Sequence, residues 1–449
     1  MRMSTKLYRQ FMGFCLYFIF SMTCFSQTLP HQAKAISQGN ITCSSSTCHG
    51  SISPWNNTSV LQNEYTTWRT YDKHSQAYKV LFNKQSQQIA KNLGLSQPAH
   101  EAALCLNCHA HNPEPQLRAE RFSHSDGVGC EGCHGPAEKW ISTHTVKGVS
   151  HADNVANGMY PTTNPAALAK LCNSCHVGDE SRFVTHRIMG AGHPRMSIEI
   201  NTFTKIEPPH YKVDSDYLTR KGAEQPVKLW AVGQATTAKS LVDLLADTKR
   251  NHDGIFPELV AFDCHACHHP MSNKRWVPRN GMPPGVIRLN DSSLMMLSAI
   301  VKVLDPNSLS QYTRLFEQLN RASFQKSTRL ESIEDLQETA KKLSKLIEQL
   351  IVKLQIVSYD EAKIRDIFLA LVQGQQYYDY ASAEQAYMAL TSVANLAVTN
   401  GSPGIRPHIK ASIDQLRKEL SNEDKFQYQN FNKEYGKLVQ ILQLNGGVK

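Results

Sequence analysis

Apolar residues recur at helical spacing through the last third of the chain. From residue 290 onward they lie three and four positions apart, as on one face of a helix. The longest run consists of Ile333, Leu336, Ala340, Leu343, Ile347, Leu350, Leu354 and Val357. A second run consists of Ile409, Ile413, Leu416 and Leu420. This pattern predicts a small antiparallel helical bundle over residues 290–449.

The first of these runs keeps a heptad spacing, and two interpretations are open. An ordinary bundle buries such a seam within its own chain. A coiled coil uses it to bind a second copy or a partner. We favour the bundle because further amphipathic helices follow, and self-association through the C-terminal helices is the alternative.

Long periodic apolar runs are scarce between residues 36 and 275, where Gly, Pro, Asn and His are frequent. One clear helix interrupts this region after Pro226, with apolar residues at Val227, Trp230, Ala231, Ala235, Ala238, Leu241, Leu244 and Leu245. The stretch WVPRNGMPPG at 276–285 is typical of a linker. We therefore expect a loop-rich domain over 36–275, a linker over 276–289 and the bundle over 290–449.

The N-terminus has the features of a secretory signal peptide over residues 1–35. Basic residues precede an apolar run at 11–25, and Ala33, Lys34 and Ala35 form a small-x-small cleavage site. An uncleaved membrane anchor is the alternative, although the run is short for a bilayer span. We expect an exported, periplasmic protein with no membrane span in its mature form.

The basic charge of the chain does not indicate a nucleic-acid partner. Residues 1–35 hold four basic residues and no acidic one, so their removal lowers the formal charge from +9 to +5. A nucleic-acid-binding protein concentrates its basic residues in a stripe or patch, and this sequence has no such stripe.

The spacing of the cysteines is the feature of the sequence that indicates its chemistry. Ten cysteines follow residue 35, in five pairs, and a histidine comes directly after each pair. The pairs are Cys43 and Cys48, Cys105 and Cys108, Cys130 and Cys133, Cys172 and Cys175, and Cys264 and Cys267. The adjoining histidines are His49, His109, His134, His176 and His268.

The pattern C-x-x-C-H is that of c-type haem attachment. Two closely spaced thiols bond to the haem vinyl groups, and the adjacent imidazole becomes the proximal ligand of the iron. The chain's composition predicts about 0.01 matches by chance, against four observed. Zinc ribbons and small disulfide loops are the alternatives, but neither requires a histidine after each pair.

The first pair departs from the pattern, because four residues separate Cys43 from Cys48. Small serines allow the loop between the thiols to bulge. We predict a fifth, variant haem site here, and a disulfide between the two thiols is the alternative. The sequence thus predicts five c-type haems.

A haem that only carries electrons is usually six-coordinate, so each iron needs a distal ligand. Our five candidates are His74, His124, His144, His186 and His193. The reserves are His111, His151, His210, His252 and His269. Methionine ligands are the less favoured choice, with Met159, Met189, Met196 and Met271 near the haem motifs.

Five stretches together resemble a known family: NEYTTWRTYDKHSQAY, CLNCHA, GVGCEGCHGPAEKW, LCNSCHVGDESRFVTHRIMGAGHP and FDCHACHH. This is a family of exported multihaem c-type cytochromes that includes the tetrahaem electron carrier of hydroxylamine oxidoreductase. The resemblance spans residues 40–270. It implies a mostly helical, loop-rich domain with closely stacked haems, most of them with two histidine ligands, and it implies that His124, His186 and His193 are distal ligands. Five sites, the longer first loop and the C-terminal extension depart from the family.

The expected fold class is mainly α, a loop-rich multihaem cytochrome c domain followed by a C-terminal helical bundle. The expected function is electron transfer between redox partner proteins. One alternative is an enzyme in which a haem keeps an open position for a small nitrogen or sulfur compound. No site has the C-x-x-C-K form of the pentahaem nitrite reductases, which lowers that expectation. Another alternative is a haem-bearing scaffold protein.

Overall fold

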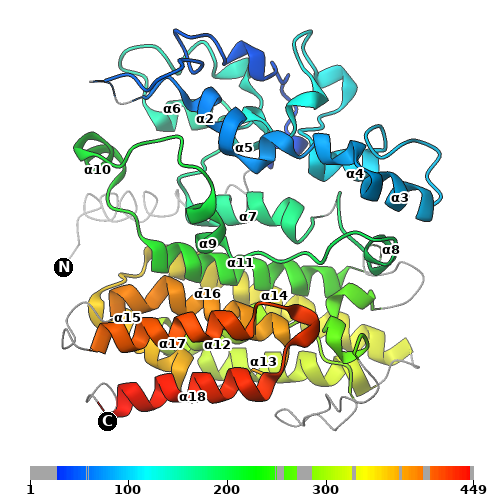
Figure 1. Cartoon of the computed structure of the whole chain (residues 1–449), viewed down its shortest axis with the longest axis vertical. Helices are drawn as coiled ribbons and strands as arrows, with labels where there is room; N and C mark the ends of the chain where they lie inside the picture. Colours follow the sequence, from blue (N-terminus) through cyan, green and yellow to red (C-terminus); the bar gives the residue numbers. More distant parts are fainter. Residues whose placement is uncertain are drawn as a thin grey trace, which may run out of the picture.

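The protein is mainly helical, as expected from the sequence (Figure 1). This computed structural model describes residues 28–56, 58, 60–179, 181–247, 249, 257–269, 286–325, 330–373, 377–397 and 405–444. Among these residues, β-structure is limited to two isolated bridges, Ser37 with Arg118 and Phe262 with Leu289. None of the helices described is long and apolar enough to cross a membrane.

The part of the chain that carries the first four Cys-His motifs consists of short helices joined by irregular segments, drawn in blue to green in Figure 1. Its α-helices are α2 (Glu64–Tyr71), α3 (Lys84–Asn92), α4 (Ala103–His109), α5 (Cys130–His134), α6 (His151–Ala156), α7 (Pro165–His176), α8 (His186–Gly190), α9 (Ile200–Ile206) and α10 (Ser215–Lys221). Its buried apolar residues fall into separate clusters of five or fewer.

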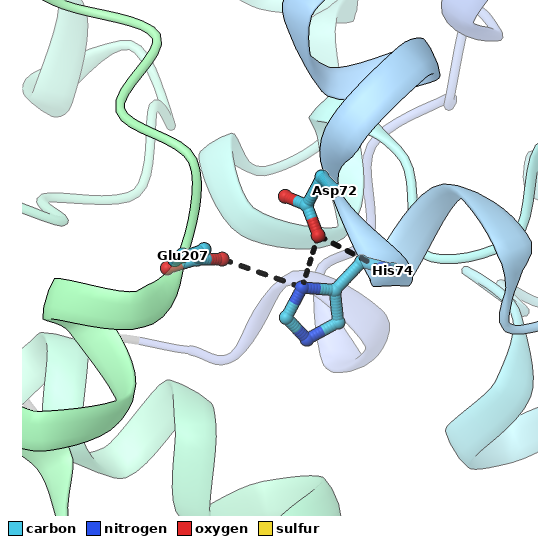
Figure 2. A group of neighbouring side chains, drawn as sticks. All are labelled: Asp72, His74 and Glu207. Atoms are coloured by element: carbon cyan, nitrogen blue, oxygen red, sulfur yellow. Dashed lines mark hydrogen bonds and ion pairs between the residues drawn. The ribbon is translucent and has the colours of Figure 1, made fainter.

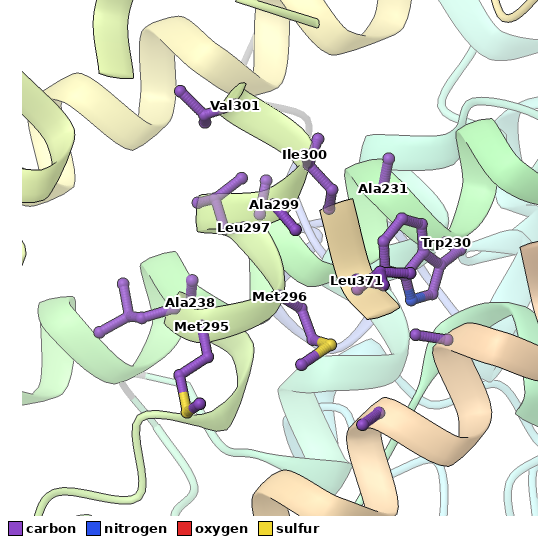
Figure 3. Packing of buried hydrophobic residues seen from close by; sticks show 14 of the residues in the cluster. Trp230, Ala231, Ala238, Met295, Met296, Leu297, Ala299, Ile300, Val301 and Leu371 are labelled. Carbon is purple, nitrogen blue, oxygen red and sulfur yellow. The ribbon is translucent and has the colours of Figure 1, made fainter. Parts of the chain in front are cut away.

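Longer helices form a bundle beneath this part (Figure 1). They are α11 (Pro226–Ala246), α12 (Ser292–Leu304), α13 (Pro306–Gln325), α14 (Leu330–Ile356), α15 (Glu361–Val372), α16 (Tyr380–Ala397), α17 (Ile405–Glu419) and α18 (Tyr428–Leu444). Consecutive helices such as α12 and α13, or α17 and α18, lie side by side. One continuous hydrophobic core extends from Val227 to Leu438, and Figure 3 shows a part of it.

Helix α11 belongs to this core, although its sequence precedes the predicted linker. Pro226 begins the helix at a position where proline is favoured. Buried residues lie on most of its circumference, as in a helix surrounded by others. Helix α11 packs against α12 and α14 on the bundle side and against α7 and α9 on the other. The core of the bundle therefore begins at residue 227 and not at residue 290.

The heptad run lies in α14 and faces the core of its own chain. Its central residues, from Leu336 to Leu354, are at most 2 % exposed. Helices α11 and α13 pack against this face. The seam is thus buried within this chain, as the bundle interpretation predicts.

Close contacts join the two parts of the chain at α11. Gly233 lies under Ile200 of α9, where a Cβ would come within 2.9 Å of the isoleucine side chain. The buried amide of Gln234 donates to Gln385 of α16 (2.8 Å). Gln385 in turn donates to the carbonyl of Ile198 (2.9 Å). These bonds hold the segment before α9 on the bundle.

The predicted signal peptide and linker are covered only in part. Residues 1–27 and 276–285 lie outside the described residues. Residues 28–35 are folded, and Leu29 is 2 % exposed in a cluster with Tyr160 and Leu171. Cleavage after Ala35 would remove this contact.

Candidate haem-binding sites

Local helix geometry explains the regular motifs. Cysteines three positions apart and a histidine one position later share one face of a helical turn. The second and third motifs form α4 and α5, and the fourth ends α7. The fifth begins at a short 3-10 helix, Cys264–Ala266, and the amide of His268 donates to the carbonyl of Cys264 (2.8 Å).

The first motif closes its longer loop by an equivalent bond. The amide of His49 donates to the carbonyl of Cys43 (3.1 Å), so the chain ends of the motif meet as in the regular sites. The amide of Cys48 donates to Ser45 within the loop (2.9 Å). Gly50 completes the turn, since a Cβ there would lie 1.8 Å from the carbonyl oxygen of Ser44. The two additional residues thus form a bulge, and the positions that carry the chemistry remain together.

All ten cysteines are free thiols, so neither the first pair nor any other is a disulfide in this structure. Zinc ribbons would gather at least three ligand atoms around one point. Within the described ranges, one group of this kind is found, and it consists of Asp72, His74 and Glu207 without a cysteine. The cysteine geometry therefore favours neither zinc nor disulfide bonding.

Each of the five motif histidines lies opposite a second histidine. The pairs, with their ring-centroid distances, are His49 with His144 (6.3 Å), His109 with His193 (6.3 Å), His134 with His210 (6.2 Å), His176 with His74 (6.3 Å) and His268 with His186 (6.0 Å). Metal–imidazole bonds are about 2 Å long, so two imidazoles on one metal ion have centroids about 6 Å apart. The spacing of all five pairs fits one iron between each pair.

Hydrogen bonds leave the same ring nitrogen available in these pairs. His109, His144 and His193 each bond through Nδ1 to a backbone carbonyl, at 3.0, 2.6 and 2.9 Å. His49 bonds through Nδ1 to Glu64 (2.9 Å), and His74 bonds through Nδ1 to Asp72 (3.0 Å). In these five histidines Nε2 is left for a metal ion, as is usual when the other nitrogen of a ligand is held by an acceptor.

Four of the five distal candidates lie opposite a motif histidine, and His124 does not. Its Nε2 is 2.8 Å from Oδ1 of Asn112, and its ring contacts Tyr78 and Phe122. His210, a reserve candidate, lies opposite His134 instead. His210 follows two prolines, and no feature of the sequence around it separates it from the other reserves.

The remaining reserves differ in position. Nε2 of buried His111 is 2.8 Å from the hydroxyl of Ser37, so this nitrogen is already engaged. His151 begins α6, and His269 directly follows the fifth motif. His252 and Met271 lie outside the described residues.

Burial keeps two of the motif histidines in the form that binds metals. It lowers the pKa of His134 and of His176 to about 4. A neutral imidazole is the ligand form, so both remain competent at neutral pH. His74 differs, because hydrogen bonds to Asp72 and Glu207 raise its pKa to about 10, so a metal ion that binds Nε2 must displace a proton from this ring.

The motifs lie near one another in a definite order. The Cys130 thiol lowers the pKa of the neighbouring Cys43 thiol, and the Cys175 thiol raises the pKa of the neighbouring Cys108 thiol. Burial, followed by the charges of Glu207 and Cys172, raises the pKa of the Cys133 thiol well above its usual value. The first motif thus adjoins the third, the third adjoins the fourth, and the fourth adjoins the second.

Two apolar side chains stand exposed next to the residues that hold His74. Tyr71, next to Asp72, is 70 % exposed, and Ile206, next to Glu207, is 72 % exposed. A porphyrin between His74 and His176 offers the apolar surface that such residues need. Free thiols, paired imidazoles and these exposed apolar side chains together fit c-type haem.

Comparison with known proteins agrees with this chemistry. Residues 42–135, which include the first three motifs, match the family model described as cytochrome c554 and c-prime. No curated protein and no solved structure matches the chain. The match supports a multihaem c-type cytochrome family, with binding of c-type haem and electron transfer as its chemistry.

Proposed function

We propose that this chain is an exported pentahaem cytochrome that carries electrons between redox partner proteins. The proposal rests on the five histidine pairs, whose ring centroids lie 6.0–6.3 Å apart. When each iron has two imidazole ligands, no coordination position is left open for a substrate. An electron carrier needs no open position, whereas the alternative enzyme does.

The proposal assigns one distal ligand to each haem. In the order of the motif histidines His49, His109, His134, His176 and His268, the distal ligands are His144, His193, His210, His74 and His186. When bound, the haems supply reversible one-electron chemistry. The chain supplies the thiols that would attach the haems and the imidazoles that would ligate their irons.

The contacts between motifs support a path for electrons through the order first, third, fourth and second. Thiol contacts link the first motif to the third and the second to the fourth. The fifth motif lies against the bundle, where the ring of His265 faces Tyr380 of α16. We propose that the first four haems form a continuous electron-transfer chain and that the fifth haem is the one nearest the bundle.

The proposal includes export, but with the signal peptide cleaved earlier in the chain than the sequence alone predicts. Leu29 is buried, and Asp179 lies 3.1 Å from His31. Cleavage between residues 33 and 35 would discard both contacts. We propose that the signal peptide is cleaved before Leu29 and that the mature chain retains residues 29–35.

The test is spectroscopy on the full chain matured in a host that attaches haem. A pyridine haemochrome assay and intact mass should give five haems, and electron paramagnetic resonance should show only low-spin iron. His210→Ala should convert one low-spin signal to high spin. The matched variant His124→Ala should leave all five unchanged. Fewer than five haems, or a high-spin haem in the wild type that binds nitrite or hydroxylamine, would overturn the proposal.

A further inference from the structure

We propose that Asp72 and Glu207 lower the reduction potential of the haem attached at Cys172 and Cys175 by accepting the Nδ1 hydrogen of its distal ligand, His74. The inference rests on the proposed function, because it takes His74 and His176 as the two ligands of one iron. Asp72 and Glu207 are positioning residues that act through the imidazole and do not contact the haem iron.

Two carboxylates converge on one ring nitrogen at this site (Figure 2). Nδ1 of His74 lies 3.0 Å from Oδ1 of Asp72 and 3.3 Å from Oε1 of Glu207. Asp72 ends α2 and is buried, and Glu207 directly follows α9. In Figure 2 the other ring nitrogen points away from both carboxylates, so they hold one side of the ring and leave the opposite side free.

Asp72 also fixes the orientation of the ring. Its Oδ1 accepts the backbone amide of His74 (2.8 Å) as well as the Nδ1 hydrogen. One oxygen thus holds both the backbone and the side chain of the same residue. The imidazole is held with its ring perpendicular to that of His176, at a centroid distance of 6.3 Å.

A carboxylate that accepts the Nδ1 hydrogen makes the imidazole a stronger donor, because it draws the proton away from the ring. The additional electron density stabilises ferric iron more than ferrous iron, which lowers the reduction potential. Two carboxylates on one imidazole should have a larger effect than one, since each adds negative charge beside the N–H group.

The other ligand histidines donate their Nδ1 hydrogens to acceptors that carry less negative charge. His109, His144 and His193 donate to neutral backbone carbonyls. His49 donates to one carboxylate, that of Glu64. Among the hydrogen bonds described for the ten ligand histidines, His74 is alone in having two carboxylate partners. These partners set its haem apart from the other four.

Glu207→Gln and Asp72→Asn in the matured full chain test the inference. Both variants keep the side-chain shape and an acceptor oxygen but remove the charge. In spectroelectrochemical titrations, the reduction equilibrium constant of one haem should rise about tenfold, a positive shift of about 59 mV for one electron. The shift should be larger for Asp72→Asn, whose carboxylate is closer and more buried, and the low-spin resonance of that haem should move with it.

Three further variants identify the haem that moves. The shifted transition should be the one that disappears in Cys172→Ser/Cys175→Ser. Glu64→Gln should move a different transition, that of the first motif. Glu120→Gln removes an exposed carboxylate of the same region, and should move none.

Two results would overturn the inference. Five low-spin haems with potentials unchanged in both variants would refute it while leaving the proposed function intact. A shift of the same transition when the wild type is treated with a chelator, but not in Glu207→Gln, would show that the three residues bind a divalent cation instead. A haem count below five would refute the proposed function first.

Discussion

The bundle and the part of the chain that carries the first four Cys-His motifs, here called the haem-binding part, differ in their hydrophobic cores. The bundle has one continuous hydrophobic core, part of which is shown in Figure 3. In this core Trp230, Tyr312 and Phe368 are at most 1 % exposed. The haem-binding part has separate clusters of five or fewer buried residues. Of seventeen exposed large apolar residues described, thirteen lie before residue 219.

The difference indicates what stabilises each part. Burial of apolar surface contributes about 25 cal/mol per Å², and the bundle obtains this from its own side chains. The haem-binding part exposes apolar residues beside its motifs, so much of its burial must come from the macrocycles. Haem would therefore complete the core of the haem-binding part, whereas the bundle core is built from side chains alone.

The largest effect expected is that of withholding haem. A full chain expressed without haem attachment should fold in its bundle and remain unfolded around its motifs. Limited proteolysis should then leave a resistant fragment that begins near residue 226, with helical circular dichroism. A haem-free chain that resists proteolysis equally before and after this point would show that the comparison is wrong.

Two matched core substitutions should destabilise the haem-binding part and the bundle separately. Leu29→Ala should destabilise the haem-binding part by about 3 kcal/mol, and Leu343→Ala should destabilise the bundle by a similar amount. Denaturant titrations followed by haem absorbance and by far-ultraviolet circular dichroism resolve the two. If Leu29→Ala has no effect on the haem transition, residues 28–35 are not part of the mature fold.

Removing a contact between the haem-binding part and the bundle should have a smaller effect. Arg195, which precedes α9, lies 3.0 Å from Glu384 of α16 and 2.9 Å from Glu423. Arg195→Gln removes the arginine that pairs with two partly buried carboxylates and should cost about 1 to 2 kcal/mol. The two unfolding transitions should then separate further.

The control for this variant is Arg220→Gln, which removes an exposed pair with Asp216 on α10. Such surface pairs contribute at most about 1 kcal/mol, and many contribute nothing. Equal effects of the two arginine variants would mean that Arg195 does not couple the haem-binding part to the bundle.

The smallest effect is pH-dependent. Although burial opposes it, hydrogen bonds from His31 and Ser181 hold the pKa of Asp179 well below its usual range. A carboxylate with a lowered pKa in the folded state contributes stability above the unfolded value of about 4, and this is lost as the pH falls through the lowered pKa. Asp179→Asn should cost about 1 kcal/mol at pH 7.

Hydrogen exchange of residues 28–37 measures this effect at pH 7 and pH 3. The wild type should keep most of its protection at pH 3, because Asp179 is still charged there. The asparagine variant should be less protected than the wild type at pH 7, and the difference should be smaller at pH 3. Loss of the whole difference by pH 4 would contradict the lowered pKa.

Sequence spacing alone predicted the features that depend on neighbouring residues. The five motifs could be identified because thioether attachment requires two thiols and an imidazole within a few residues. The seam of α14 could be predicted as core because helical periodicity is local. Helix α11 was predicted as a helix, but its place in the bundle depends on contacts with α12 and α14 that no local pattern contains.

The histidine that lies opposite each motif histidine was decided by the tertiary structure. His74, His144, His186 and His193 could be proposed from sequence, but their partners could not, because each pair joins segments distant along the chain. His124 and His210 exchanged roles for the same reason, since a reserve and a candidate look alike until the fold brings one of them opposite His134. Attachment is local chemistry and was determined by the sequence itself, whereas ligation across the iron and the two carboxylates at His74 depend on how distant segments pack.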